Sequence, residues 1–250
     1  MCYGTRVIKT AAELENHYRI EAIYGELEKD NELIYNYANG FSHPIMWILP
    51  QERRGHMIPV MWGLIPAYEL GADAQAYYKK TIPYGSGLNA RSEKLFDSNN
   101  YRTSALKRRC VIPVDGFFEP HTAKKNGKDF NIPFYFQRKN EGMINLAGIY
   151  AVTQDKMVTF TVLTKAATPL FAKIHNKKQR RPVILNDADV AKWLDDSLRE
   201  EDILGVINND LADGSMQAYP ISKDLYKRNG EGDRADIITP VHYGEIETEY

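Results

Sequence analysis

Two nucleophiles can meet on a single residue near the start of this chain. Cys2 follows Met1, and cysteine is small enough at the second position for a methionine aminopeptidase to remove Met1. The exposed α-amine would have a pKa of ~8 and the thiol a pKa of ~8.5, so both are partly available near neutral pH. Such a 1,2-aminothiol condenses with an aldehyde: the amine forms an imine, and the sulfur then closes a five-membered thiazolidine ring. By itself Cys2 is a weak signal, because most second-position cysteines are ordinary termini.

Three further segments carry polar side chains suited to chemistry. Asn89 can both donate and accept hydrogen bonds, and Arg91 can bind a phosphate with two parallel bonds. Glu119 ends an apolar run next to two phenylalanines, a setting that raises the pKa of a carboxyl group and makes it a proton carrier. His175 lies among basic residues, which favours the neutral imidazole. Taken singly, each segment also fits a turn, a core strand or a solvated loop.

Overall charge gives no support for nucleic-acid binding, because 32 basic and 33 acidic residues leave a formal net charge of −1. Any contact with DNA must come from a local basic surface. The densest basic run spans residues 173–181, with lesser ones at 107–109 and 124–125. A basic run is more often a solvated loop, and the alternative is a surface that contacts phosphates without reading sequence.

Targeting and cofactor signals are absent from the sequence. No stretch approaches the ~18 apolar residues of a membrane span, and no secretory signal precedes the first helix. The two cysteines, Cys2 and Cys110, cannot form a disulfide framework, so we expect a soluble, cytoplasmic protein with reduced thiols, associated with the nucleoid if bacterial. Histidines and cysteines show no zinc spacing. We therefore expect no metal, no cofactor and no membrane partner.

The pattern of elements favours an α+β fold. Thr10 and Glu13 form a capping box that opens a helix running to about Ala22. Short helices are expected within 92–108, and Asn186 is expected to cap a helix carrying Trp193. Strand-like runs rich in β-branched and aromatic residues occupy 43–50, 57–66, 110–118, 133–138, 143–152 and 156–164, with a hairpin loop at Thr122–Asp129 and short strands and loops at 216–241.

Consecutive strands without repeats or long linkers predict a single domain over residues 1–250, with its core at about 2–240. The predicted architecture is an antiparallel, barrel-like β core with short flanking helices.

Taken together and in this order, these segments resemble the SRAP family, the SOS response-associated peptidases that act as abasic-site shield proteins. That family begins with Met-Cys. The matching elements are Trp-Gly-Leu-Ile-Pro at 62–66, Asn-Ala-Arg-x-Glu at 89–93, Arg-Cys-x-x-Pro-x-x-Gly-Phe-x-Glu at 109–119, Leu-Ala-Gly-Ile at 146–149, and Ile-His at 174–175 ahead of Pro-Val-Ile-Leu at 182–185.

The resemblance implies a monomeric protein that binds abasic sites in single-stranded DNA and forms a stable thiazolidine cross-link through Cys2. It further implies that Asn89 hydrogen-bonds near the Cys2 amine and the opened sugar. Glu119 would protonate the sugar ring oxygen and serve as general acid–base, and His175 would orient the sugar or stabilise its developing hydroxyl. DNA contacts are expected from Arg6, Trp62, Arg91, Lys173, Lys177, Lys178 and Arg181.

The chain departs from the family pattern at three places. It starts Met-Cys-Tyr-Gly-Thr-Arg instead of Met-Cys-Gly-Arg, so Arg6 would replace an earlier DNA-contacting arginine. Pro120 stands where the family often has a tryptophan after the acidic residue, which puts stacking at that position in doubt. The spacing from His175 to Pro182 is also longer.

Two alternatives remain open. The first is a cysteine-type peptidase, self-processing or acting in trans, with Cys2 as nucleophile and His175 as general base. The second is a non-catalytic single-strand-binding module that uses the basic run and tyrosine side chains.

Overall fold

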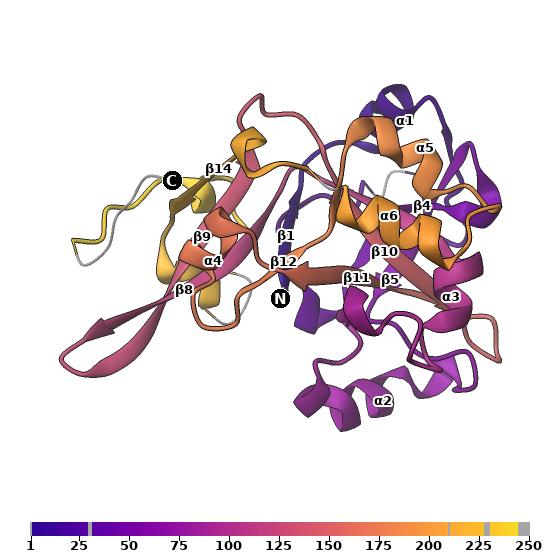
Figure 1. Ribbon diagram of the computed structural model, residues 1–250, viewed down its shortest axis with the longest axis horizontal. Coiled ribbons are helices and arrows are strands. Elements are labelled where there is room, and N and C mark those ends of the chain that lie inside the picture. Colours follow the sequence, from indigo (N-terminus) through magenta and orange to yellow (C-terminus); the bar gives the residue numbers. More distant parts are fainter. Residues whose placement is uncertain (1, 30–31, 210, 228–230, 245–250) are drawn as a thin grey trace.

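The chain forms two β-sheets surrounded by short helices, as the computed structural model describes for residues 2–29, 32–209, 211–227 and 231–244 (Figure 1). The strands are β1 (Gly4–Val7), β2 (Glu21–Ala22), β3 (Tyr35–Asn39), β4 (Ile45–Pro50), β5 (His56–Trp62), β6 (Asn89–Arg91), β7 (Arg109–Val114), β8 (Gly116–Lys125), β9 (Lys128–Arg138), β10 (Ile144–Val152), β11 (Val158–Ala166), β12 (Arg180–Pro182), β13 (Ile184–Leu185) and β14 (Met216–Pro220). The α-helices are α1 (Ala11–Tyr18), α2 (Ala74–Thr81), α3 (Arg102–Lys107), α4 (Pro169–Ile174), α5 (Val190–Trp193) and α6 (Glu200–Asn208).

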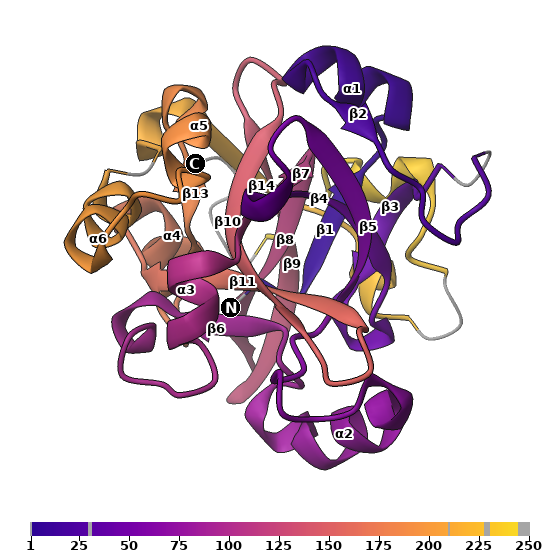
Figure 2. The ribbon, with the colours of Figure 1, turned by 90° about the vertical axis from the view of Figure 1, so that its right-hand side faces the viewer.

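Five strands of the larger sheet close into a barrel. Neighbours pair antiparallel in the order β5, β4, β7, β10, β11, and β11 then pairs in parallel with β5 at Phe160↔Trp62 (Figure 2). Alternate residues point inward, so Ile112, Leu146 and Phe160 pack in its interior. The remaining strands β2, β6, β12 and β13 extend this sheet. The expected α+β fold with a barrel-like core is confirmed.

The second sheet has the order β14-β9-β8-β1-β3. Only Asp115 separates β7 from β8, so one continuous run of chain passes from the barrel into this sheet. The β8–β9 hairpin projects from the body of the molecule (Figure 1). Its turn is Asn126-Gly127, with φ angles of 51° and 76°, the left-handed conformations that a two-residue hairpin turn requires. Pairing continues to Lys125↔Lys128, so the expected loop at 122–129 is shorter than predicted.

The first helix begins as expected and ends early. Thr10 and Glu13 form the capping box. At the other end, Arg19 adopts the left-handed conformation and its N–H bonds to Glu15 O, which stops α1 at Tyr18 instead of Ala22. The following residues pair with β5 as β2 instead.

Two other expected elements are also shorter. The strand expected over 57–66 ends at Trp62, because Gly63 turns the chain with a φ of 129°. Asn186 makes no side-chain cap; its Nδ2 donates to Asp189 and to Asn209 O. A 3₁₀ turn therefore precedes a four-residue α5. Short helices do occur within 92–108, and short strands and turns follow residue 216.

Both cysteines are free and buried. Among the described residues, no helix is long and apolar enough to cross a membrane. The same part of the chain contains no group of three or more acidic, histidine or cysteine side chains that could hold a metal ion.

Candidate functional site

Strand β1 carries Cys2 to the edge of β8. The two strands pair antiparallel, with Gly4 opposite Phe118, so the residues before Gly4 run alongside those after Phe118. The Cys2 side chain is fully buried, and its Sγ donates to Gly4 O at 3.6 Å. Burial raises the pKa of the Cys2 thiol, and the nearby Glu119 carboxylate raises it further. The thiol is therefore protonated at neutral pH.

Asn89 lies against Cys2 from the other sheet. Strand β6 pairs in parallel with β11, and there Asn89 Nδ2 donates to Cys2 O at 2.9 Å. The Asn89 Oδ1 atom is buried and accepts no hydrogen bond from the described residues. A buried acceptor of this kind is costly unless a ligand satisfies it, so it suits an incoming amine or hydroxyl group.

The loop before Asn89 depends on a glycine. Gly87 has a φ of 67°, and a Cβ atom there would lie 2.3 Å from Leu64 O. Leu64 N in turn donates to Gly87 O at 3.0 Å. Only glycine combines this conformation with so close an approach. The two motifs at 62–66 and 89–93 are thus held together at this point.

Glu119 and His175 form a buried acid–imidazole pair. Glu119 is 1% exposed and His175 3%. Glu119 Oε2 lies 3.3 Å from His175 Nδ1, which is also 3.0 Å from Arg180 O. Because a carbonyl oxygen only accepts, Nδ1 carries the proton and Nε2 is left as an acceptor.

Burial shifts both groups of this pair toward their neutral forms. It raises the pKa of Glu119 to about 7, and it lowers the pKa of His175 to about 4. At neutral pH, His175 is uncharged and Glu119 is divided between acid and carboxylate. A carboxyl group in this state can give or take a proton at the pH at which proteins work.

The end of α4 is attached to β8 by an asparagine. Asn176 Oδ1 accepts from Thr122 N at 3.0 Å, and its Nδ2 donates to Thr122 O at 2.9 Å. This pair of bonds holds the residue after His175 against the strand that carries Glu119. Sequence reasoning gave Asn176 no role, because nothing in the pattern linked residues so far apart.

A second link joins His175 to the strand of Asn89. Arg180 donates to both carboxylate oxygens of Glu93, at 2.6 and 2.9 Å, and to Thr164 O at 2.8 Å. The hydrogen bonds from Arg180 lower the pKa of Glu93. Since Arg180 O accepts the His175 proton, this ion pair connects the 89–93 segment with the imidazole. Sequence reasoning missed this function of Glu93, although the residue stood within a quoted motif.

Cys2, Asn89, Glu119 and His175 therefore come together at one place. Cys2 lies just before β1, Asn89 and Glu119 lie on β6 and β8, and His175 follows α4. Direct contacts or neighbouring charges link each to another member.

Several expected DNA contacts lie on the surface near this place. Arg91, Lys173, Lys177 and Lys178 are exposed. Lys177 pairs with Asp129 on β9 at 3.2 Å. Arg6 is half-buried, and one of its guanidinium nitrogens lies 3.5 Å from Asn36 Oδ1. These five cations remain candidates for phosphate contacts.

Two expected DNA contacts are wrong. Trp62 is fully buried and its Nε1 donates to Leu88 O at 2.9 Å. Arg181 is also fully buried, and it donates to Thr168 Oγ1 at 3.1 Å and to Leu211 O at 3.2 Å. Neither side chain has surface to offer to DNA, so both stabilise the fold instead.

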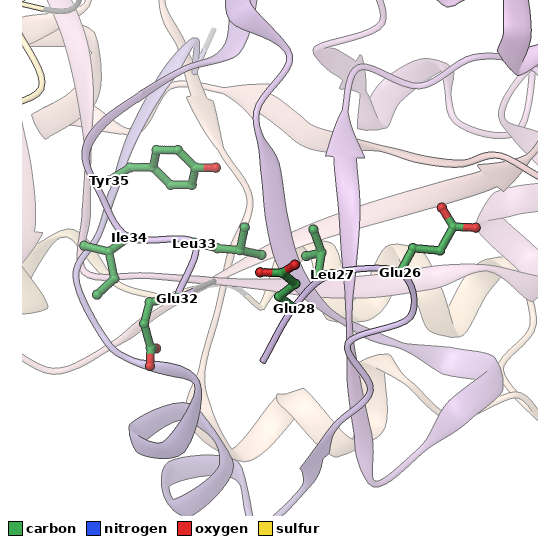
Figure 3. A pocket seen from close by; sticks show the side chains of 7 residues that line it. All are labelled: Glu26, Leu27, Glu28, Glu32, Leu33, Ile34 and Tyr35. Carbon is green, nitrogen blue, oxygen red and sulfur yellow. The ribbon is translucent and has the colours of Figure 1, made fainter. Parts of the chain in front are cut away.

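One sizeable surface pocket does not suit DNA. It has a volume of about 660 Å³ and lies away from Cys2, on the segment before β3 (Figure 3). Its described lining residues include three carboxylates and no basic side chain: Glu26, Leu27, Glu28, Glu32, Leu33, Ile34 and Tyr35. Phosphate groups would be repelled there.

Comparison with known proteins identifies the family of this chain. The family model described as SOS response associated peptidase (SRAP) matches residues 1–228. The chain belongs to the SRAP family. Its relatives include the abasic site processing protein YoqW of Bacillus subtilis, 28% identical over 192 residues, which are 75% of this chain and 78% of that protein. Another is the abasic site processing protein YedK of Escherichia coli, 26% identical over 232 residues, 88% of this chain and 91% of YedK.

Solved structures show the same SRAP fold. A protein from Bacteroides thetaiotaomicron superposes with a TM-score of 0.81 at 26% identity, covering 96% of this chain and all (100%) of the other. A protein from Bordetella bronchiseptica superposes with a TM-score of 0.67 at 19% identity, covering 88% and 100%. At 19% identity, the Bordetella bronchiseptica protein shows only that the fold is shared.

Proposed function

We propose that this SRAP protein binds abasic sites in single-stranded DNA and bonds covalently to the sugar aldehyde through Cys2 once Met1 is removed. The observation that carries the proposal is the buried Glu119–His175 pair beside a cysteine at position 2. The names of the relatives, abasic site processing proteins, support the choice of substrate.

The proposed reaction uses the Cys2 amine and thiol as nucleophiles and Glu119 as the proton carrier. Glu119 in its acid form protonates the sugar ring oxygen, and its carboxylate takes up the proton of the anomeric hydroxyl as the ring opens to the aldehyde. The Cys2 amine adds to the aldehyde carbon, a proton from Glu119 helps the hydroxyl leave as water, and the iminium nitrogen returns a proton to the Glu119 carboxylate to give the imine. The Cys2 sulfur adds to the resulting imine carbon while the thiol proton passes to the nitrogen. Aldehyde and aminothiol thus give thiazolidine and one water, and Glu119 ends as it began.

Asn89 and His175 hold the reacting groups. The Asn89 amide already bonds to Cys2 O, and its buried oxygen would accept from the freed amine or from the opened sugar. His175 offers Nε2 as an acceptor for a sugar hydroxyl, because its other nitrogen donates to Arg180 O. A neutral imidazole can do this without competing with Glu119 for the proton.

Exposed cations next to this site would position the DNA backbone. Lys173, Lys177 and Lys178 follow or flank His175, and Arg91 ends the strand that carries Asn89. Contacts to phosphate of this kind fix the position of a strand without reading its sequence. Such local contacts suit a protein whose net charge is only −1.

The same surroundings disfavour the peptidase alternative. A peptidase cysteine needs a lowered thiol pKa and a basic partner. Here burial and Glu119 raise the thiol pKa of Cys2, and burial lowers the pKa of His175 to about 4.

A denaturing gel tests the proposal. Protein freed of Met1 is incubated with an oligonucleotide containing one abasic site, and we expect a band that survives denaturation. Cys2→Ala should abolish that band, whereas Cys110→Ala, which changes the other cysteine, should keep it. A preparation that retains Met1 should form none.

The other outcomes identify the alternatives. Peptide cleavage in trans without any adduct would favour the peptidase. Salt-sensitive binding to intact single strands, independent of Cys2, would favour a plain binding module.

A further inference from the structure

The residues that follow His175 form a turn that orients its imidazole. Gln179 N donates to His175 O at 2.9 Å, and Ala167 N donates to Gln179 O at 3.0 Å. The next residue, Arg180, provides the carbonyl oxygen that accepts from His175 Nδ1 at 3.0 Å. The orientation of the imidazole therefore depends on where the turn at residues 176–179 lies.

Asn176 attaches this turn to one edge of β8. Strand β9 pairs along the other edge of β8, and β1 pairs with this one only from Gly116 to Phe118. Further along, Asn176 Oδ1 accepts from Thr122 N at 3.0 Å and Asn176 Nδ2 donates to Thr122 O at 2.9 Å. A side-chain amide offers a donor and an acceptor as a peptide group does, so Asn176 takes the place of one residue of a neighbouring strand.

A further bond fixes the residue before His175. His121 Nδ1 lies 3.0 Å from Ile174 O, at the end of α4, which packs against β8 (Figure 1). His175 is thus held between two anchors, Ile174 and Asn176, on the strand that carries Glu119. These anchors set the distance of 3.3 Å between Glu119 Oε2 and His175 Nδ1.

We propose that Asn176 is a positioning residue of the cross-linking reaction, which keeps His175 in contact with Glu119 through its two hydrogen bonds to Thr122. The inference rests on the proposed function and adds to it. Burial raises the pKa of Glu119 to about 7. If the turn moves away, water reaches the carboxyl group and its pKa falls toward the ordinary value, so that less of it carries a proton at neutral pH.

Several titratable groups surround Glu119. Burial raises the pKa of Cys2, Tyr3 and Tyr226, and the charge of Glu119 adds to the shift, so these side chains are neutral at pH 7. Burial lowers the pKa of His175 to about 4. The freed Cys2 amine titrates near pH ~8 in every variant. A ratio of rates between two proteins cancels the amine and reports on Glu119.

Cross-linking rates measured from pH 5 to pH 8 test the inference. Protein freed of Met1 reacts with an oligonucleotide that contains one abasic site. For Asn176→Ala we expect the maximal rate at pH 7 to fall about ten- to a hundredfold, because the reacting groups are misplaced, with the half-saturating DNA concentration unchanged. The ratio of the variant rate to the unaltered rate should also decrease about tenfold between pH 5 and pH 8, as follows if the pKa of Glu119 falls by about one.

Two variants are controls. Asn186→Ala also removes two hydrogen bonds of an asparagine side chain, to Asp189 and to Asn209 O, in another part of the chain. Thr122→Ala removes a side chain but keeps the backbone atoms that bond to Asn176. For both controls the ratio of rates should stay near one and should not change with pH.

Asn176→Gln keeps the amide but places it one carbon further out, so the two bonds cannot both form on the same backbone. It should show the same dependence on pH, and it provides the test if Asn176→Ala does not fold. If the unaltered protein forms no adduct, the proposed function fails and the inference fails with it. If adducts form but the Asn176 variants match Asn186→Ala, or their ratios are low and independent of pH, the inference alone is overturned and the proposed function stands.

Discussion

Arg109 on β7 and Glu119 on β8 are both buried, but their surroundings differ. Arg109 donates to the carbonyl oxygens of Ala105, Leu106 and Trp193 at 2.7 to 3.0 Å, and also to that of Asp195. Burial lowers its pKa only to about 10, so the guanidinium remains charged at neutral pH. Backbone carbonyls thus neutralise this charge locally, and the residue ties α3 and α5 to the barrel.

Glu119 has the neutral His175 beside it and a pKa raised by burial to about 7. Near neutral pH, Glu119 is therefore present in both its protonated and its ionised form. The contrast shows that burial alone does not make a reactive group. A buried ion surrounded by complementary dipoles is structural, whereas a buried acid with an uncharged partner is ready to exchange a proton.

Among variants that test the difference between Arg109 and Glu119, Glu119→Gln should have the largest effect. We expect the cross-linking rate to fall ~10²- to 10⁴-fold, the usual contribution of a general acid–base group. The rate of the unaltered protein should also decline as the pH rises through about 7, where Glu119 loses its proton, and the variant should lack this decline. Initial rates on denaturing gels across the pH range measure both.

The same variant should bind intact single strands with nearly unchanged affinity and salt dependence. A large loss of affinity would contradict a role in proton transfer and would place Glu119 in DNA binding instead.

Arg109→Met should act on stability and spare the chemistry. We expect the free energy of unfolding to fall by about 3–5 kcal/mol, because several buried carbonyls lose their donors. Arg108→Met is the matched control; Arg108 is partly exposed and pairs with Glu52 at 3.6 Å, so its loss should cost under about 1 kcal/mol. Denaturant unfolding measures both. If Arg109→Met instead slowed cross-linking per folded molecule as much as Glu119→Gln, the contrast between the two residues would not hold.

The pH dependence of stability separates the two members of the acid–imidazole pair. The raised pKa of Glu119 makes the folded state bind its proton more tightly than the unfolded state, so its contribution falls as pH rises from about 4.5 to about 7. The lowered pKa of His175 has the opposite sign: its contribution rises from about pH 4 to about 6.5.

These two slopes nearly cancel in the unaltered protein. In Glu119→Gln only the His175 contribution remains, so the free energy of unfolding of the variant should rise with pH. Relative to the unaltered protein it should gain up to about 3 kcal/mol near pH 7. Chemical denaturation at several pH values tests this. A constant difference between the two proteins would mean that Glu119 titrates normally.

The smallest effect is expected on the exposed surface. Lys177→Gln combined with Lys178→Gln should reduce the slope of log affinity against log salt by up to about 1.4, at ~0.7 for each phosphate contact on a single strand. The exposed pair Lys79 and Lys80 on α2 gives the control, since those residues lie in another part of the chain. If both double variants show the same slope of log affinity against log salt, Lys177 and Lys178 do not contact the DNA.

Local patterns in the sequence predicted much of the fold. Alternating β-branched residues marked the barrel strands, the Thr10–Glu13 box marked the start of α1, and Asn126-Gly127 marked the long hairpin. Errors arose at ends of elements, such as Arg19 and Gly63, where a backbone conformation or a distant partner stops the element. Burial was the other source of error, because Trp62 and Arg181 looked like DNA-contacting residues and lie in the interior.

Within the candidate site, the sequence by itself determined which residues are available: a cysteine at position 2, an asparagine and an acid in recognisable motifs, and a histidine within a basic run. Their chemistry follows from residue type and neighbours along the chain. Only the tertiary structure decided which charges are buried, that Glu93 pairs with Arg180, and that Asn176 bonds to Thr122. The physical reason is that pKa values, ion pairs and hydrogen bonds depend on distances between residues far apart in the chain, and no local pattern encodes those distances.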